Sequence, residues 1–304
     1  MKLRIVFMGT PSFAVPSLSI LLENGFEVVG VITATDKYGG RGKKTLIESD
    51  VKKFAKSKGL PILQPKNLKD PAFLEDLALW KANLQIVVAF RMLPEVVWNM
   101  PELGTFNLHG SLLPKYRGAA PLNWAIINGD KETGVSTFFL QHEIDTGDLL
   151  LQESLPIGEN ETAGELHDRM MELGATTVLK TVQQIKKQEI TGQKQNDALA
   201  SKAPKIFHDT CQVDFHQNTQ QVHDFIRGMS PYPAAWTLLD GKTLKLLRST
   251  KEMETPKTPP GSFETDNKSF LRIATLDGYV HIHELQLQGR KRMPTTMFLN
   301  GFNF

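Results

Sequence analysis

Two short runs, Leu84-Gln-Ile-Val-Val-Ala89 and Gly104-Thr-Phe-Asn-Leu-His109, have the apolar and β-branched character of central strands in a parallel sheet. Similar runs lie nearer the N-terminus at Leu3–Met8 and Phe26–Ile32, and the segment Val15–Glu23 between them is expected to be a helix. Strands that alternate with helices are typical of a parallel sheet with crossover helices. The fold class predicted for this part of the chain is therefore α/β, with a parallel-type sheet.

The alternation continues until the composition changes near Thr191. Residues 193–204 are polar and small without clear periodicity, which is typical of a linker. We therefore predict a first domain over residues 1–189, a linker over 190–206 and a second domain over 207–304. The remaining elements expected in the first domain are strands at Val135–Leu140 and Asp148–Leu155 and helices near Ile47–Lys58, Ala120–Ile127 and Glu161–Gln188.

The second domain is predicted to be mostly β, as a small barrel with one helix around Thr219–Gly228. Two dipeptides, Asp240-Gly241 and Asp277-Gly278, are hairpin signals between short alternating runs. Those runs are Ala235–Leu239, Thr243–Leu247, Phe270–Thr275 and Tyr279–Leu285.

The composition is that of a folding chain, with 40% hydrophobic and 22% charged residues among 304. No apolar run approaches the roughly 18 residues that span a bilayer, and the N-terminus turns at Gly9-Thr-Pro11 too early for a secretory signal. A single cysteine, Cys211, excludes internal disulfides and fits a reducing compartment, so we expect a cytoplasmic protein. The 35 basic and 33 acidic residues balance to +2, so any basic surface must be local.

The residues best suited to chemistry follow the second of the two central runs. Asn107 and His109 are two apart on a predicted strand and therefore share a face, at the edge where open α/β sheets bind ligands. Asp145 follows the strand predicted at Val135–Leu140. An amide, a base and an anion at one crevice suit direct attack of an amine on a carbonyl, although a structural role for the Asn-x-His pair stays open. Ser111 lacks the G-x-S-x-G context of a serine hydrolase.

The glycine-rich loop Gly39-Gly-Arg-Gly-Lys-Lys-Thr45 is basic but does not match a phosphate-binding P-loop, because Lys37 and Lys44 stand where glycine and Ser/Thr are required. Gly9-Thr-Pro-Ser12 likewise departs from the dinucleotide fingerprint. The basic loop is either a solvated surface loop or a clamp for a phosphate backbone.

The second domain carries two further basic stretches, which are either solvated faces or a nucleic-acid surface. They comprise Lys242, Lys245, Arg248 and Lys251, and the run Gly289-Arg-Lys-Arg292. His281 and His283 share a strand face, but no third ligand lies at a suitable spacing, so we interpret them as structural and expect no metal.

Taken together, several motifs resemble the folate-dependent formyltransferases, and the similarity runs essentially from end to end. The motifs are Asn107-x-His-x-Ser-Leu-Leu-Pro114, Tyr116-Arg-Gly-Ala-Ala-Pro121, Asp145-Thr-Gly-Asp148, Phe7-Met-Gly-Thr-Pro-Ser-Phe-Ala-Val-Pro16, Ile226-Arg-Gly228, Pro231-Tyr-Pro-Ala-Ala-Trp236 and Gly289-Arg-Lys-Arg-Met293. The resemblance is strongest to the branch that formylates initiator methionyl-tRNA.

The resemblance implies a Rossmann-like N-terminal domain that binds 10-formyltetrahydrofolate and a C-terminal OB-like barrel that helps to hold tRNA. It implies that Asn107 hydrogen-bonds the formyl oxygen, that His109 takes part in proton transfer and that Asp145 orients His109. It also implies a monomer. The implied folate contacts are Ser111, Leu112, Leu113, Pro114, Phe90 and Met92, and the implied tRNA contacts are Arg41, Lys43 and Lys44.

Two other activities remain open within this resemblance. The stretch His109-Gly-Ser-Leu-Leu-Pro-Lys-Tyr-Arg-Gly118 is shared with enzymes that formylate amino-sugar nucleotides. The stretch Phe90-Arg-Met92 resembles glycinamide ribonucleotide formyltransferase as much as it resembles the tRNA branch. The Phe7–Pro16 opening and the loop at Arg41 favour the tRNA branch. A non-catalytic RNA-binding module is a third reading, which nothing in the sequence recommends.

Overall fold

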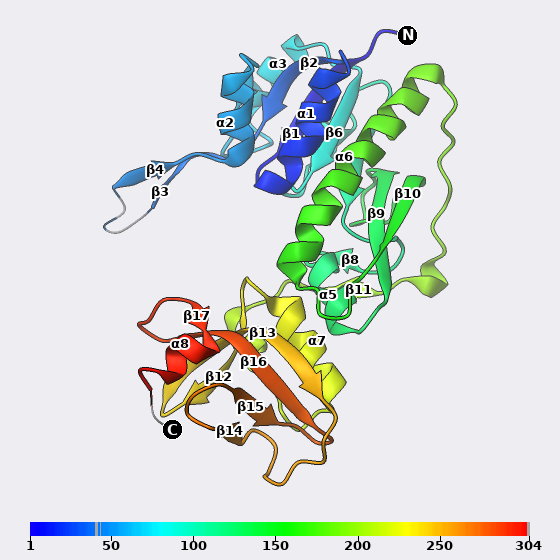
Figure 1. Ribbon diagram of the computed structural model, residues 1–304. Helices are drawn as coiled ribbons and strands as arrows, with labels where there is room; N and C mark the ends of the chain where they lie inside the picture. Colours follow the sequence, from blue (N-terminus) through cyan, green and yellow to red (C-terminus); the bar gives the residue numbers. More distant parts are fainter. Residues whose placement is uncertain (40–41, 43, 303–304) are drawn as a thin grey trace. The chain divides into compact units, whose positions relative to one another are not determined.

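The computed structural model describes residues 1–39, 42 and 44–302, and its elements are labelled in Figure 1. Contacts divide the chain into two compact units. Unit 1 contains residues 1–117, 134–154 and 168–201, and unit 2 contains residues 118–133, 155–167 and 202–304. The domain boundaries predicted above, 1–189, 190–206 and 207–304, stay a prediction.

The main sheet of unit 1 has the strand order β10-β9-β7-β6-β1-β2-β5. β1 pairs in parallel with β2 and β6, and β6 pairs in parallel with β7, so the predicted α/β class with a parallel-type sheet is confirmed. The strands are β1 (Arg4–Gly9), β2 (Glu27–Ile32), β5 (Ile62–Leu63), β6 (Leu84–Val88), β7 (Thr105–His109), β9 (Glu132–Phe139) and β10 (Leu149–Pro156).

Helices cover this sheet because alternate strand side chains are apolar on both faces. Val6 and Met8 of β1 pack in one cluster with Phe73 and Leu77 of α3. On the sheet's other face, α1 and α6 run across the strands (Figure 1), and α6 approaches so closely that a Cβ on Gly174 would lie 2.7 Å from the Leu108 side chain. The helices are α1 (Val15–Glu23), α2 (Asp50–Ser57), α3 (Pro71–Leu79), α4 (Glu95–Trp98) and α6 (Ala163–Lys187), with 3₁₀ turns at Ser12–Ala14 and Asp197–Leu199.

One strand runs against the direction assumed from the sequence. β9 pairs antiparallel with β7, with Phe139 opposite Phe106 and Ser136 opposite His109. The end of β9 therefore lies at the amino end of β7, not at the carboxyl edge where His109 stands. The loop after β9 has to return along β7 for Asp145 to come near His109.

Two parts of the first 100 residues also differ from the prediction. The segment predicted as a glycine-rich loop, Gly39–Thr45, joins the two strands of a short ribbon, in which β3 (Lys37–Gly39) pairs with β4 (Thr45–Ile47). The helix α3 was not predicted, although its sequence carries a usual start signal. Asp70 is the N-cap and its carboxylate accepts a hydrogen bond from the Ala72 amide, and Pro71 is the first residue of the helix.

Unit 2 is built around an antiparallel half-barrel sheet with strand order β12-β13-β16-β15-β14, to which β17 adds beside β16, so the predicted mostly-β fold is confirmed. Asp240 and Gly241 both have positive φ, 49° and 71°, as the predicted tight turn between β12 and β13 requires. The elements are α5 (Pro121–Ile127), α7 (Thr219–Met229), β12 (Ala235–Leu239), β13 (Lys242–Glu252), β14 (Phe263–Thr265), β15 (Leu271–Ala274), β16 (Tyr279–Leu287), β17 (Met293–Pro294), α8 (Thr295–Leu299), a 3₁₀ turn at His208–Cys211, and the short pair β8 (Arg117–Gly118) with β11 (Lys202–Ala203).

The core of unit 2 lies between this sheet and α7. Ile226 and Met229 of α7 pack in one cluster with Leu244 of β13 and Ile282 of β16. α7 also carries charge into the interior: the Arg227 guanidinium, 2% exposed, donates to Asp224 and to the carbonyls of Gly158 and Glu161. The Nε and Nη1 groups of this buried cation thus meet carboxylate and carbonyl oxygens, as burial of a charge requires.

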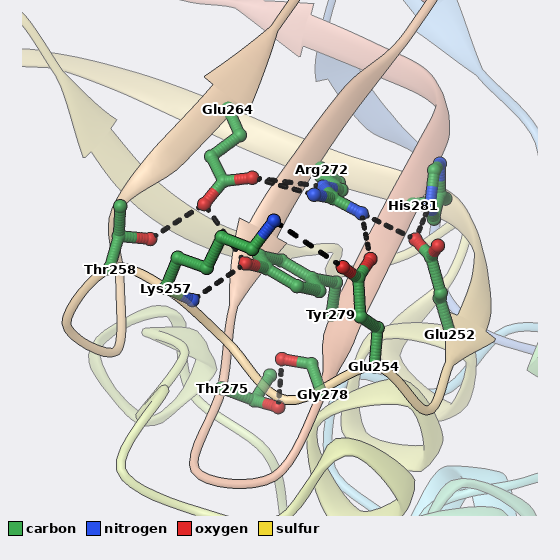
Figure 2. A network of polar contacts seen from close by, with 10 residues as sticks. All are labelled: Glu252, Glu254, Lys257, Thr258, Glu264, Arg272, Thr275, Gly278, Tyr279 and His281. Atoms are coloured by element: carbon green, nitrogen blue, oxygen red, sulfur yellow. Dashed lines mark hydrogen bonds and ion pairs between the residues drawn. The ribbon is translucent and has the colours of Figure 1, made fainter.

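A second polar network lies on the sheet of unit 2 (Figure 2). Arg272 of β15 donates to Glu252 at 3.0 Å, to Glu254 at 3.0 Å and to Glu264 at 2.8 Å, and its guanidinium stacks 3.8 Å above the Tyr279 ring. One cation therefore links three carboxylates from two segments of the barrel, the end of β13 and β14.

Candidate active site

β7 carries both side chains of the predicted Asn-x-His pair. It lies between β6 and β9, and Phe106 and Leu108 on the alternate face are buried. This alternation leaves Asn107 and His109 on the same face at the carboxyl end of the strand. Their juxtaposition was predicted from the two-residue spacing, and the structure places them so.

The imidazole of His109 is held in one orientation by a backbone carbonyl. Its Nε2 lies 2.8 Å from the carbonyl oxygen of Tyr116, and the ring meets Phe138 edge-on. Because a carbonyl can only accept, Nε2 carries the hydrogen in this arrangement. A proton that the neutral ring takes up must therefore go to Nδ1.

Asp145 faces that second nitrogen. Its Oδ2 lies 3.8 Å from His109 Nδ1, and both side chains are about nine-tenths buried, with 10% and 8% exposed. This separation exceeds a direct hydrogen bond, but it is short enough for the carboxylate to stabilise a proton on Nδ1. The loop that presents Asp145 is tightly constrained, since Asp145 has φ 57° and a Cβ on Gly147 would lie 1.6 Å from the Phe139 carbonyl oxygen.

Asn107 is the third member of the trio. Its Oδ1 is buried without a hydrogen-bond partner among the residues that the structure describes. Buried polar atoms of this kind are uncommon, and one beside a base and an anion is suited to hydrogen-bonding a substrate.

Sequence comparison supplies the family. The family described as Formyl transferase matches residues 1–182, and the one described as Formyl transferase, C-terminal domain, matches residues 205–303. The chain belongs to the formyl transferase family. It is a formyl-transferring enzyme.

Relatives of this formyltransferase are similar over almost their whole length. A methionyl-tRNA formyltransferase of Parabacteroides distasonis is 54% identical over 310 residues, which cover 99% of this chain and 96% of the relative. Another, of Flavobacterium johnsoniae, is 48% identical and covers 100% and 97%.

Solved structures share the fold of this formyltransferase. The sugar 3N-formyl transferase WlaRD, studied in the presence of dTDP and 5-N-formyl-THF, is 22% identical with a TM-score of 0.70, over 96% of this chain and 100% of that one. The methionyl-tRNA formyltransferase from Clostridium thermocellum is 16% identical with a TM-score of 0.57, over 82% and 94%. At these identities the likeness shows the fold alone.

The loop after β7 in this formyltransferase is fixed by polar contacts of its own. Ser111 is fully buried and its hydroxyl donates to the Lys115 carbonyl at 2.6 Å, while its carbonyl accepts from Ser136 at 2.6 Å. The Leu113 amide donates to the same Ser136 hydroxyl at 3.0 Å. Ser111 and Leu113 therefore shape the loop with their side chains turned inward, whereas Leu112 and Pro114 are half-buried.

The structure describes some of the other predicted substrate contacts but not all of them. Phe90 is partly buried against the core cluster of unit 1, and Met92 is 76% exposed. Lys44 is exposed and directly precedes β4, whereas Arg41 and Lys43 lie outside the described residues. Their roles in binding stay predictions.

Among the described residues there is no group of three or more His, Cys, Asp or Glu side chains that could hold a metal, and no helix long and apolar enough to cross a membrane. The His281 ring nitrogen contacts Glu252, and the His283 Nε2 lies 2.7 Å from the Thr250 hydroxyl. Both rings therefore have protein partners, and their interpretation as structural stays a prediction.

Residues that the sequence reasoning missed surround the trio. The Tyr116 carbonyl, which holds His109, belongs to a quoted motif, but the spacing gave no reason to single it out. Gln195 contacts the Asp145 loop, although it lies in the segment predicted as a linker. No periodicity or motif marks it, because its contacts join segments that are distant in sequence.

Proposed function

We propose that this formyltransferase moves the formyl group of 10-formyltetrahydrofolate to the α-amino group of methionine on initiator methionyl-tRNA. Support for the acceptor comes from the relatives at 54% and 48% identity, both named for methionyl-tRNA. Support for the chemistry comes from one observation: a histidine fixed in one tautomer faces a buried carboxylate beside an asparagine with an unpaired buried oxygen.

The reaction is a direct transfer. A C–N bond forms between the amine and the formyl carbon, the bond from that carbon to the folate N10 breaks, and a proton passes from the amine to N10. An α-amino group has a pKa of about 8, so a nearby base needs to supply only modest help in presenting it neutral at pH 7.

Each residue of the trio has one part in this scheme. The side-chain NH₂ of Asn107 donates a hydrogen bond to the formyl oxygen as negative charge develops on it, since Oδ1 can only accept. His109 accepts a proton at Nδ1, since Nε2 already donates to Tyr116. Asp145 stabilises the resulting imidazolium and, across the 3.8 Å separation, can share a bridging water with it.

The folate donor suits the surroundings of the trio. The unpaired Asn107 oxygen fits an N–H or O–H donor brought by a substrate, and a structural neighbour was studied with a formylated folate. We propose that the loop Ser111–Pro114 lines this donor, with Phe90 and Met92 as an apolar wall. The inward-turned side chains of Ser111 and Leu113 assign those two residues to shaping the loop.

The tRNA acceptor needs phosphate contacts that fix position without reading sequence. We propose that Arg41, Lys43 and Lys44 supply them to the acceptor end, with the second domain adding a salt-dependent contribution. The enzyme is expected to act as a monomer.

The deciding experiment is formyl transfer from 10-formyltetrahydrofolate to charged initiator methionyl-tRNA, with uncharged tRNA and an amino-sugar nucleotide as parallel acceptors. Transfer confined to the charged tRNA is the expected result. Transfer to the sugar nucleotide alone would keep the catalytic trio and overturn the acceptor. Absence of transfer to every acceptor would overturn the chemistry.

A further inference from the structure

The Asp145 loop is held by a side chain from a distant part of unit 1. The Gln195 amide nitrogen donates to the Asp145 carbonyl at 2.9 Å and to the Gly147 carbonyl at 2.8 Å. Both hydrogens of one NH₂ group are thus used on the two carbonyls that flank Thr146. The contact fixes the backbone whose left-handed turn points the Asp145 carboxylate at His109.

Arg117 in turn fixes the other end of the Gln195 amide. Its Nε and Nη2 donate to Gln195 Oε1 at 3.1 and 2.8 Å, and Nη2 also donates to Asp197 at 2.7 Å. This pairing settles which end of the amide faces the Asp145 loop, because a guanidinium can only donate. Polarisation of the amide by the cation also strengthens the two bonds that its nitrogen gives.

The same segment contacts the loop that orients His109. Arg117 directly follows Tyr116, whose carbonyl accepts from His109 and whose amide donates to the Ser201 hydroxyl at 2.9 Å. The Gln193 backbone pairs with Leu149 at 2.7 and 2.8 Å, just beyond the Asp145 loop. Residues 193–201 therefore bind the segments on both sides of the His109–Asp145 pair.

We infer that Gln195 is a positioning residue for formyl transfer: its amide, oriented by Arg117, holds the Asp145 loop so that the carboxylate faces His109 Nδ1. The inference rests on the proposed function where it is tested by enzyme kinetics. Where it is tested by the mobility of the Asp145 loop, it does not depend on the acceptor. A misplacement of about 1 Å in a reacting group can cost up to ~100-fold in rate, so loosening this loop should lower kcat.

The test replaces Gln195 with Met, which has similar length but no amide, and with Glu, which can still accept from Arg117 but cannot donate. We expect both variants to lower kcat by ~10-fold or more with KM values for folate and tRNA within about twofold of wild type. The matched control is Gln183→Met on the exposed face of α6, which should leave both constants unchanged.

A second measurement follows the loop directly by amide hydrogen exchange in the full-length protein. The amides of Phe139 and Leu149 are hydrogen-bonded at the base of the Asp145 loop, to Asp148 and Gln193. They should exchange faster in Gln195→Met than in wild type or Gln183→Met. Unchanged exchange at both amides would overturn the inference, even if the wild-type enzyme used another acceptor.

Two kinetic outcomes would also overturn it. One is a kcat within twofold of wild type in both Gln195 variants. The other is a KM rise as large as the fall in kcat, which indicates damage to binding rather than to positioning. Arg117→Lys supplies an independent check, because it keeps the charge but loses the two-pronged contact with Gln195, and it should reproduce a smaller fall in kcat. An unchanged kcat there would remove Arg117 from the inference.

Discussion

His109 has one nitrogen bound to the protein and one facing a carboxylate, which makes its ring the centre of the proposed proton transfer. Replacement by alanine should lower kcat by ~100-fold or more, the usual contribution of a general acid–base group, with little change in KM for tRNA. Steady-state kinetics with charged initiator tRNA measure this. Unchanged turnover would exclude His109 from the mechanism.

Asn107 lets activity be separated from stability. Its buried oxygen lacks a partner within the described part of the chain. Replacing Asn107 with leucine, which has a similar size, should therefore not lower the melting temperature. The same change should reduce kcat by ~100-fold, since it removes the hydrogen bond that we propose the Asn107 NH₂ group donates to the developing oxyanion. Calorimetry beside kinetics tests both parts. A variant that is less stable yet fully active would refute this assignment.

His223 on α7 is buried, and its burial lowers its pKa to about 4. The unfolded chain binds a proton near pH 6.5 and the folded chain only near pH 4, so the stability that neutral His223 permits is complete above pH 6.5 and is lost as the pH falls toward 4. The loss amounts to about 3 kcal/mol. Urea unfolding across this range measures how the free energy of unfolding changes with pH. This change should be smaller in His223→Gln than in wild type, and an identical pH dependence would contradict the assignment.

At the scale of elements, strands with strong apolar and β-branched runs were predictable, and β1, β2, β6 and β7 lie within a residue or two of their expected positions. The direction of β9 could not be predicted, because a buried strand has the same apolar pattern whether it pairs in parallel or antiparallel. Asp145 was therefore singled out correctly as a neighbour of His109, but on the assumption that two strand ends meet. The contact actually depends on a returning loop held by Gln195.

The sheet of unit 2 owes part of its stability to Arg272. Contacts from His281 and Arg272 hold the pKa of Glu252 below its ordinary value, and hydrogen bonds from Thr258, Arg272 and Tyr279 outweigh burial to lower that of Glu264. This stabilisation is present above the ordinary carboxylate pKa of 4.5 and is lost as the pH falls through the lower folded values.

Arg272→Met should therefore lower the free energy of unfolding by about 2 kcal/mol at neutral pH, because it leaves three neighbouring carboxylates without their shared cation. The deficit should shrink in acid, where the carboxylates are protonated. Denaturant titrations of both proteins at neutral and acidic pH measure this difference. A deficit that stays constant with pH would mean that packing against Tyr279, not charge, is lost.

At the scale of the whole molecule, the near balance of charge hides a local asymmetry among the basic residues of unit 2. Arg248 pairs with Glu165, Lys251 with Glu159 and Arg292 with Glu284, so these cations are partly neutralised. Lys242, Arg290 and Lys291 are exposed, and the contacts described for unit 2 include no ion pair for them. The sequence could indicate basic stretches but not which members are neutralised by distant acids.

Lys242→Glu combined with Lys291→Glu should therefore raise KM for tRNA and reduce the dependence of tRNA affinity on salt, with kcat near wild type. The matched control is Lys251→Gln, whose lysine is paired. Binding assays over a range of salt concentrations distinguish the two. Equal effects in both proteins would mean that charge pairing does not select the binding surface.

The segment 193–201 was predicted to be a passive connection, and in the structure it holds the loops on either side of the candidate active site. This sets a rule for protein engineering. A catalytic module transplanted into a chimera and cut at residue 189 would carry all three residues of the trio but would lack Gln195 and Ser201, which hold the loops around them. Domain exchange between formyltransferases should place the junction after Ser201, so that each graft brings its own frame.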